Sequence, residues 1–304
     1  MQDECTCGSR KTHSIRVLLD EAVERLLAHG VENPTLNAER LLCQIFGIRR
    51  VDLYVEAERV YAFEFAQEFR SLVARRCAGE PLQYIVGEAE FMSLPFKTDR
   101  RALIPRPETE ILVEHVLCWC KTRSAGSKTV KMLEIGAGSG CIAVSLAKYL
   151  PAAQVLAVDV TEEALSLARE NARLNGVANQ VEFMQADYLD DHFAPTLGQK
   201  FDAVVSNPPY VSLEDYSQLP AEIREFEPEI ALHDGGDGTS FYRRLTEAAP
   251  AVLRKGGLLA VEVGLGQARA VESLFDRNGF RRITSLADLN DIKRVVSGEC
   301  GRYF

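Results

Sequence analysis

The 304-residue chain is poor in positive charge and has no dense basic run. Its 35 Lys and Arg residues stand against 44 Asp and Glu residues, which gives a formal net charge of -9 at pH 7. An acidic surface repels a phosphate backbone, so nucleic acid is a poor partner unless basic residues cluster locally. Adjacent basic residues form isolated pairs, such as Arg100–Arg101, Arg243–Arg244 and Arg281–Arg282. We therefore expect no nucleic-acid partner.

A long apolar run and a secretory leader are also lacking. No apolar run approaches the roughly 20 residues that a membrane-spanning helix needs. The N-terminus carries charged residues but not the apolar segment of a signal peptide. The proportions of 46% hydrophobic and 26% charged residues are ordinary for a globular protein with a sizeable core. The sequence therefore predicts a cytoplasmic protein without a membrane partner.

Closely paired cysteines are scarce, although the chain has eight cysteines. The close pairs are Cys5 with Cys7 and Cys118 with Cys120. Structural zinc sites usually place about two to four residues between paired cysteines, and neither pair does. The second pair lies in a helical pattern, where such neighbours point to different faces. We expect no metal site, and reduced thiols typical of a cytoplasmic protein.

Residues 1–81 are predicted to form an N-terminal helical bundle, with a disordered lead-in over residues 1–10. Apolar residues recur at helical spacing in three stretches between residues 14 and 80, which makes the module all-helical. Breaks fall at Asn33-Pro34, at Gly47 and near Gly79. Nothing in the bundle suggests chemistry. A module ahead of an enzyme core often holds a macromolecular partner, and this is our hypothesis here.

Residues 82–105 are predicted to be a β-hairpin-like linker. Short strands are expected at Tyr84–Val86, at Phe91 and at Leu94–Phe96, with turns at Gly87 and Pro95. A helix should then begin within the sequence RPETE at 106–110, because proline suits the first helical position and acidic residues suit a helix N-terminus.

Residues 106–304 are predicted to form one α/β domain. Short apolar strands alternate with amphipathic helices, which implies a parallel sheet covered on both faces. The end of the chain, 281–286 and 293–297, is expected to form a hairpin-like pair. The expected strands are 130–135, 154–158, 181–184, 201–206 and 258–263, and the expected helices are 141–149, 162–174, 240–253 and 267–278.

The loop Glu134–Gly140 directly follows one expected strand and directly precedes a helix. Its glycines allow a sharp turn, and the helix N-terminus offers free N–H groups to a ligand. Asp159 ends the next strand, where a carboxylate can accept hydrogen bonds from two ribose hydroxyls. The spacing G-x-G-x-G differs from the dinucleotide fingerprint G-x-G-x-x-G. In this context the loop indicates an adenosine-containing cofactor in preference to a purely structural turn.

Asp187 and Tyr188 follow the third expected strand, on the same sheet edge as the glycine loop. The carboxylate is placed to accept a hydrogen bond from an adenine amine, and the ring is placed to stack on the base. A solvated loop with no ligand is the alternative for this pair.

The sequence Asn207-Pro208-Pro209-Tyr210 ends a fourth buried strand. Two successive prolines remove two N–H donors and restrict φ, which leaves a stiff turn that presents carbonyl acceptors. The Asn207 side chain adds another acceptor, and Tyr210 adds a flat apolar face. A planar –NH2 group, which has two hydrogens to donate, fits such a turn.

An amide or aromatic –NH2 nitrogen is a poor nucleophile because its lone pair is delocalised. Acceptance of its two hydrogens by the Asn207 side chain and the Pro208 carbonyl would shift electron density toward the nitrogen. It would also turn the nitrogen toward the methyl of S-adenosylmethionine (SAM). Alignment of this kind can supply about 7–11 kcal/mol of a barrier. The sequence therefore predicts a SAM-dependent methyltransferase acting on an amide or aromatic –NH2 group.

The chain resembles the N5-glutamine methyltransferases of peptide-chain release factors, the PrmC/HemK family. The resemblance covers residues 14–304, in order. It rests on PLQY at 81–84, EF at 90–91, RPETE at 106–110, GAGSG at 136–140, NPPY at 207–210, and EP, AL and DGG between 227 and 236. One departure is the sequence DLNDIKR at 288–294, where the family often has Asp-Leu-x-Gly; we expect it to change a turn and not the chemistry.

The resemblance implies an α/β fold, with a seven-stranded Rossmann-like class I SAM-dependent methyltransferase domain after a small all-helical domain. It implies that the substrate is the glutamine of the GGQ motif of class-1 release factors. The resemblance also implies that Asn207 contacts both SAM and the substrate, and that residues 207–210 hold the glutamine amide. The SAM site that it implies is lined by Gly136, Ala137, Gly138, Ser139, Gly140, Asp159 and Tyr188.

Four alternatives stay open at this point. A sister enzyme that methylates a glutamine of a ribosomal protein would share every catalytic feature. A nucleic-acid adenine or cytosine amino-methyltransferase meets the same geometric problem, but it must extrude a base and grip phosphates, which the acidic charge opposes. A nucleotide-dependent dehydrogenase fails on the glycine spacing and leaves the two prolines unexplained. A non-catalytic SAM-binding regulator would be excluded by turnover.

Overall fold

The computed structural model describes residues 13–123, 129–191 and 193–301. The expected disordered lead-in, with Cys5 and Cys7, lies outside these residues. The chain forms two compact units, of which the first ends at Gly87 and the second begins at Glu88. No helix in the described ranges is both long and apolar enough to cross a membrane.

The first unit is built on helices, and the three predicted helical stretches are confirmed. Leu18, Leu26 and Leu41 are fully buried in its core. The expectation of an all-helical module was incomplete, because β1 (His13–Ser14) pairs antiparallel with β2 (Val60–Tyr61). The helices are α1 (Ile15–Ala28), α2 (Pro34–Phe46), α3 (Arg50–Val55), α4 (Phe63–Cys77) and α5 (Leu82–Val86).

The strand expected at Tyr84–Val86 was wrong, because these residues belong to helix α5. Ile85 N–H donates to the Pro81 carbonyl at 3.1 Å, and Gly87 closes the turn with a left-handed φ of 79°. Three consecutive apolar residues resemble a buried strand, yet here one helical turn buries Ile85 and Val86 in the core of the first unit. Tertiary burial therefore outweighed the local pattern.

The turn expected at Pro95 was also wrong. Strand β3 (Glu88–Phe91) pairs antiparallel with β4 (Leu94–Lys97), and Pro95 lies inside β4 opposite Glu90. The turn falls at Met92 and Ser93, whose φ values are 52° and 57°. Proline is tolerated in this strand because the hairpin has only two strands, so a missing N–H on the outer edge breaks no ladder bond.

The second unit contains a seven-stranded sheet with the order β10-β11-β9-β8-β5-β6-β7. Strands β9, β8, β5, β6 and β7 run parallel to one another. Strand β11 pairs antiparallel with β9, and β10 pairs antiparallel with β11. The predicted α/β class and the hairpin at the chain end are confirmed. The strands are β5 (Val130–Ile135), β6 (Ala153–Asp159), β7 (Val181–Gln185), β8 (Phe201–Ser206), β9 (Leu253–Glu262), β10 (Phe280–Ala287) and β11 (Lys293–Cys300).

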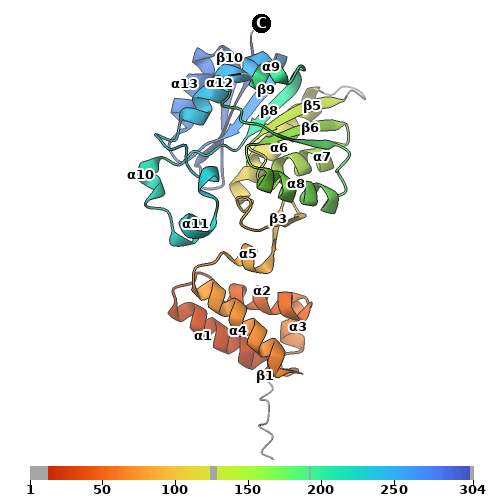
Figure 1. Ribbon diagram of the computed structural model, residues 1–304, viewed down its shortest axis with the longest axis vertical. Coiled ribbons are helices and arrows are strands. Elements are labelled where there is room, and N and C mark those ends of the chain that lie inside the picture. The colour runs from red at the N-terminus through yellow and green to blue at the C-terminus, as the bar shows by residue number, and fades with distance from the viewer. Residues whose placement is uncertain (1–12, 124–128, 192, 302–304) are drawn as a thin grey trace, which may run out of the picture. The chain divides into compact units, whose positions relative to one another are not determined.

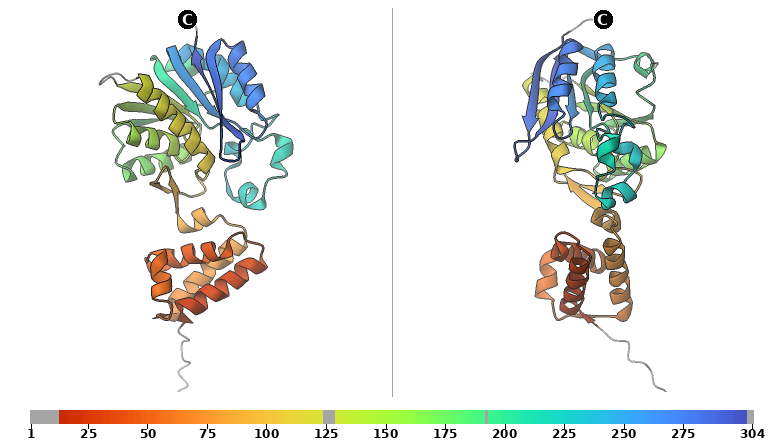
Figure 2. Two further views of the ribbon diagram at one scale, coloured as in Figure 1. Left: turned by 180° about the vertical axis from the view of Figure 1, so that it is seen from behind. Right: turned by 90° about the vertical axis from the view of Figure 1, so that its left-hand side faces the viewer.

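Helices cover both faces of the sheet, as expected (Figure 1, Figure 2). One face packs against α6 (Pro107–Arg123), α7 (Cys141–Tyr149) and α8 (Glu162–Leu174). The other packs against α9 (Phe193–Thr196), α12 (Ser240–Val252) and α13 (Ala268–Arg277). Between β8 and α12 the chain forms α10 (Leu213–Tyr216), α11 (Ala221–Phe226) and the 3-10 turn η1 (Glu229–Ala231), which sequence periodicity did not predict.

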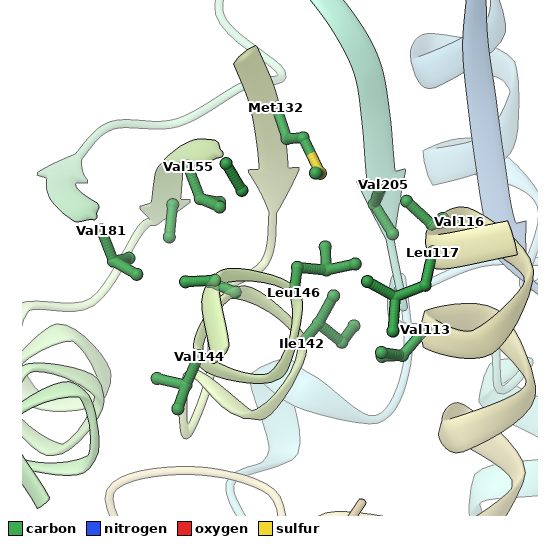
Figure 3. Close-up of a cluster of buried hydrophobic side chains, with 14 of the residues drawn as sticks. Val113, Val116, Leu117, Met132, Ile142, Val144, Leu146, Val155, Val181 and Val205 are labelled. Atoms are coloured by element: carbon green, nitrogen blue, oxygen red, sulfur yellow. The ribbon is translucent and has the colours of Figure 1, made fainter. Parts of the chain in front are cut away.

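Figure 3 shows how the α6–α8 face is filled. Met132 of β5 and Val205 of β8 meet Ile142 and Leu146 of α7, while Leu117 of α6 closes the side of the cluster. All but Leu117, which is 6% exposed, are at most 2% exposed. Burial of each such side chain contributes roughly 1.5–3 kcal/mol, so this core holds the strand ends in fixed positions.

Candidate active site at the carboxyl edge of the sheet

The glycine loop 136–140 leaves β5 at Ile135 and enters α7 at Cys141. Gly136, Gly138 and Gly140 have φ values of 78°, 52° and 79°, a region that other residues rarely adopt. A Cβ on Gly140 would lie 2.9 Å from the Cβ of Ala168 on α8, whereas a Cβ on Gly138 would meet nothing within 4 Å. Gly140 is therefore required for packing, and Gly138 borders open space where a ligand can approach.

Asp159 ends β6 beside this loop, as the sequence predicted. One carboxylate oxygen accepts the Gly138 N–H at 2.9 Å, and the other accepts the N–H and hydroxyl of Thr161 at 3.0 Å each. These bonds fix the side chain against the loop, and the oxygen that accepts the Gly138 N–H keeps a lone-pair site for a further donor. The pairing of a fixed carboxylate with an open glycine loop suits the ribose of a nucleoside.

Asp187 and Tyr188 follow β7 at the same edge but differ in exposure. Asp187 is exposed, and one of its carboxylate oxygens accepts the Leu189 N–H at 2.8 Å. Tyr188 is only 9% exposed and packs on Phe241, with ring centroids 5.6 Å apart. Its hydroxyl has no hydrogen-bond partner among the described residues. Stacking of Tyr188 on an adenine stays a prediction, and it would use the small exposed part of the ring.

The turn that begins at Asn207 leaves β8, the strand next to β5 in the sheet. The Ser206 hydroxyl donates to the Ile135 carbonyl at 2.8 Å and ties the two strand ends together. A Cβ on Gly136 would lie 3.8 Å from the Asn207 carbonyl oxygen, so the turn lies close beside the glycine loop. In open α/β sheets, ligands bind where neighbouring strands send their connections to opposite faces, and β5 and β8 form such a point.

A hydrogen-bonded chain that the sequence reasoning missed lies behind Asn207. Its Nδ2 donates to the Thr109 hydroxyl at 3.1 Å, and that hydroxyl donates to Glu262 Oε2 at 2.6 Å. The Tyr210 hydroxyl donates to Glu262 Oε1 at 3.3 Å. Thr109 lies in the first turn of α6, and Glu262 ends β9. The available signal was an acidic residue directly after the apolar run 258–261.

The carboxyl of Glu262 is in an unusual electrostatic setting. It is 2% exposed, and burial raises its pKa to about 7, against the opposing effect of the hydrogen bonds from Thr109 and Tyr210. Burial, with the nearby Glu262 charge as a smaller cause, also raises the pKa of the Tyr210 hydroxyl. Perturbed groups of this kind concentrate at functional sites.

Glu134 is a second buried carboxyl at this edge. It is 1% exposed, and its Oε2 accepts the Ala143 N–H at 3.0 Å, at the start of α7. Burial raises the pKa of Glu134 well above its ordinary value. Its Oε1 has no hydrogen-bond partner among the described residues. A buried acceptor beside an open glycine loop fits the amino group of a bound cofactor.

Two further contacts hold the turn that follows Asn207. Gln267 Nε2 donates to the Tyr210 carbonyl at 2.8 Å, while its Oε1 accepts the Gly264 N–H at 2.9 Å. Arg106 Nη2 donates to Glu227 Oε1 at 2.5 Å, and Glu227 Oε2 accepts the Ile104 N–H at 3.2 Å. The first contact joins Tyr210 to the segment after β9, and the second joins residues 104–106 to Glu227.

Comparison with known proteins gives two matching family models. Residues 18–87 match the model described as the PrmC N-terminal domain. Residues 108–223 match the model described as the methyltransferase small domain. The glycine loop and the Asn207 turn both fall inside the second match.

Relatives with curated names match nearly the whole chain. The release factor glutamine methyltransferase of Geobacter sulfurreducens is 43% identical over 288 residues, which cover 95% of this chain and 97% of that protein. The enzyme of the same name from Moorella thermoacetica is 45% identical over 261 residues, which cover 86% of this chain and 89% of that protein. Among solved structures, the hMettl16 catalytic domain has a TM-score of 0.53 at 15% identity, and the match covers 81% of this chain and 86% of that one. This likeness shows the fold alone.

Proposed function

The chain belongs to the family of release factor glutamine methyltransferases, and from this premise we propose its reaction and its site. It transfers a methyl group from S-adenosylmethionine to the side-chain amide nitrogen of the glutamine in the GGQ motif of class-1 release factors. The observation that carries the proposal is that the Asn207 turn lies close beside the glycine loop, at neighbouring strand ends. A cofactor on the loop and an amide on the turn would then meet.

The cofactor would be held on the loop side of this contact. Asp159 would accept hydrogen bonds from the ribose hydroxyls, and Asp187 and Tyr188 would contact the adenine. The open space beside Gly138 supports this assignment, because a ligand can reach the backbone there. When bound, S-adenosylmethionine supplies a methyl group on a positively charged sulfur. The residues proposed to hold it are Gly136, Ala137, Gly138, Ser139, Gly140, Asp159, Asp187, Tyr188 and Asn207.

The substrate glutamine would be held on the turn side, by Asn207, Pro208, Pro209 and Tyr210. Its –NH2 group would donate one hydrogen to Asn207 Oδ1 and the other to the Pro208 carbonyl oxygen. Pro208 is buried, whereas Asn207 and Tyr210 are half-buried, so the turn is rigid on its inner side and accessible on its outer side. Asn207, Pro208 and Tyr210 are the proposed catalytic residues.

Two acceptors favour the reaction in two ways. They pull electron density toward the amide nitrogen, and they orient its lone pair toward the methyl carbon. The amide nitrogen held in this way would gain the methyl group as the cofactor's sulfur–carbon bond is broken, and it would then lose one proton to water. That proton becomes acidic as the new bond forms, so this step needs no strong base in the site.

The test is mass spectrometry of a release factor incubated with the protein and S-adenosylmethionine. We expect a mass gain of one methyl group on the GGQ glutamine, and no gain on a release factor whose GGQ glutamine is replaced by alanine. Methylation of a ribosomal protein glutamine in the same assay, with the release factor unchanged, would contradict the substrate assignment. Methylation of DNA or RNA would contradict the reaction class.

A further inference from the structure

Above its pKa of about 7, where the experiments below are made, the buried Glu262 carboxyl is ionised and sets the direction of the hydrogen bonds behind Asn207. An ionised carboxylate only accepts hydrogen bonds, and a threonine hydroxyl has one proton to donate. The Thr109 hydroxyl donates that proton to Glu262 Oε2, at 2.6 Å. Its oxygen can then only accept from Asn207, which lies 3.1 Å away through Nδ2.

The direction of these bonds determines which end of the Asn207 amide faces the substrate. The two orientations of an asparagine amide have nearly the same shape, so packing alone does not distinguish them. The flipped amide would place Oδ1 against an oxygen whose only proton already goes to Glu262. The –NH2 end of Asn207 would then face the –NH2 end of the substrate, and two donors would meet.

We propose that Glu262 and Thr109 are positioning residues, which hold the Asn207 amide with Oδ1 turned toward the substrate amide. This inference rests on the proposed function, because it assigns a purpose to the acceptor that the reaction needs. Glu262 also accepts the Tyr210 hydroxyl through Oε1 at 3.3 Å. One buried carboxylate therefore fixes both ends of the 207–210 turn, at Asn207 through Thr109 and at Tyr210 directly.

The first experiment removes the hydroxyl and keeps the shape, in the full chain. We expect Thr109→Val to slow single-turnover methyl transfer at saturating S-adenosylmethionine and release factor by at least about tenfold, the effect of one buried unpaired group. The affinity of this variant for the release factor should change much less than its transfer rate. Thr109→Ser, which restores a hydroxyl, should recover most of the rate. A wild-type rate in a folded Thr109→Val protein would overturn the inference.

The chain offers a matched pair as a control. Asn278 Nδ2 donates to the Thr246 hydroxyl at 3.1 Å, and Thr246 is 1% exposed. Thr246→Val therefore removes a buried hydroxyl with the same kind of partner, away from the 207–210 turn. Its single-turnover rate should stay at the wild-type value. An equal rate loss in Thr246→Val and Thr109→Val would mean that the loss is a general effect on the fold, which contradicts a positioning role.

The second experiment reverses the direction of the bonds. In Asn207→Asp, the Thr109 hydroxyl faces two acceptors and has one proton. In Asn207→Asp combined with Glu262→Gln, the new amide at 262 can donate to Thr109, whose hydroxyl can then donate to the carboxylate at 207. At a pH where the Glu262 carboxyl is ionised and has no proton to donate, we expect the double variant to transfer methyl at least about tenfold faster than Asn207→Asp alone.

Adding Thr109→Val to this double variant separates hydrogen bonding from charge. The gain in rate should disappear, because the reversed bonds pass through the Thr109 hydroxyl. A gain that survives without the hydroxyl, or a double variant no faster than Asn207→Asp, would overturn the inference. Failure of the proposed function is distinguishable, because the wild-type protein would then leave the release factor unmethylated.

Discussion

The Gly138 N–H donates a 2.9 Å hydrogen bond to the Asp159 carboxylate, which joins the glycine loop to the end of the neighbouring strand. Asp159→Ala should therefore weaken S-adenosylmethionine binding in two ways, through the lost ribose contacts and through a less ordered loop. Each charge-assisted hydrogen bond is worth roughly 1.5–3 kcal/mol. Isothermal calorimetry measures the effect.

A matched control for Asp159 lies at the opposite edge of the sheet. Asp202 accepts the Lys131 N–H at 2.9 Å, another bond between a carboxylate and a backbone N–H. Asp202→Ala should leave the affinity for S-adenosylmethionine unchanged. Unchanged affinity in Asp159→Ala as well would remove Asp159 from the proposed cofactor site.

Two glycines of one loop should respond differently to alanine. Both have positive φ, so each substitution costs about 1–2 kcal/mol of backbone strain. Gly140→Ala adds a contact of 2.9 Å with the Ala168 Cβ, whereas Gly138→Ala meets nothing within 4 Å. In urea unfolding, Gly140→Ala should lose about 1–3 kcal/mol more than Gly138→Ala, from overpacking. The reverse order would contradict the packing role of Gly140.

Gly138→Ala should act on the cofactor instead. Its new methyl group would occupy the open space where the proposed ligand approaches the loop. A folded Gly138→Ala protein should therefore bind S-adenosylmethionine more weakly than the wild type, by calorimetry. Wild-type affinity would place the cofactor away from this glycine.

Stability should depend on pH through Glu262. Its pKa of about 7 lies above the ordinary value of 4.5, chiefly because of burial. The nearby charge of Glu108 raises this pKa further, and that of Arg294 lowers it. The folded state therefore binds the proton more tightly than the unfolded chain. The resulting stability is complete below about pH 4.5 and is lost as pH rises through about 7. A pKa raised from 4.5 to about 7 corresponds to roughly 3 kcal/mol of stability.

Glu262→Gln should remove this dependence. Between about pH 5 and pH 8, the free energy of unfolding of the wild type should fall by roughly 3 kcal/mol relative to that of the variant. Urea unfolding at both pH values measures the difference, and Glu163→Gln at an exposed position is the control. Parallel pH profiles of wild type and Glu262→Gln would show that Glu262 titrates alike in both states.

Removal of the first unit should separate cofactor binding from substrate recognition. The hydrophobic core of the first unit contains no residue after Val86, and every proposed cofactor residue follows residue 129. A chain that begins at Glu88 should bind S-adenosylmethionine with wild-type affinity but fail to methylate intact release factor. Equal methylation rates for the truncated, folded protein and the full chain would contradict a docking role.

Much of the fold could be predicted because its elements have strong local signals. The strands at 130–135 and 201–206 and the helices at 141–149 and 162–174 have the bounds that apolar periodicity predicted. Each is a regular, well-buried element bounded by glycine, proline or polar residues. Residues 84–86 failed because one helical turn is too short to show a period, and its burial depends on helices distant in the sequence.

The site could be predicted only where the chemistry is contiguous. The glycine loop and the Asn207 turn are unbroken motifs, and the structure brings them together. Thr109 and Glu262 are 153 positions apart, and their contact follows from the order of the strands, which no local pattern contains. Tyr188 illustrates the opposite case, since its position after β7 was expected but its 9% exposure was not.

The role of Asn207 is tested most directly by single-turnover methyl transfer to a release factor by Asn207→Ala at saturating S-adenosylmethionine. We predict a rate loss of at least about a hundredfold, because the substrate amide loses an acceptor and its alignment. Asn278→Ala is the control, because Asn278 donates to the Thr246 hydroxyl at 3.1 Å, the same distance as from Asn207 to Thr109, and this variant should transfer methyl at the wild-type rate. Near-normal transfer by a folded, cofactor-saturated Asn207→Ala protein would contradict the proposed role, because the glutamine amide would then be held elsewhere.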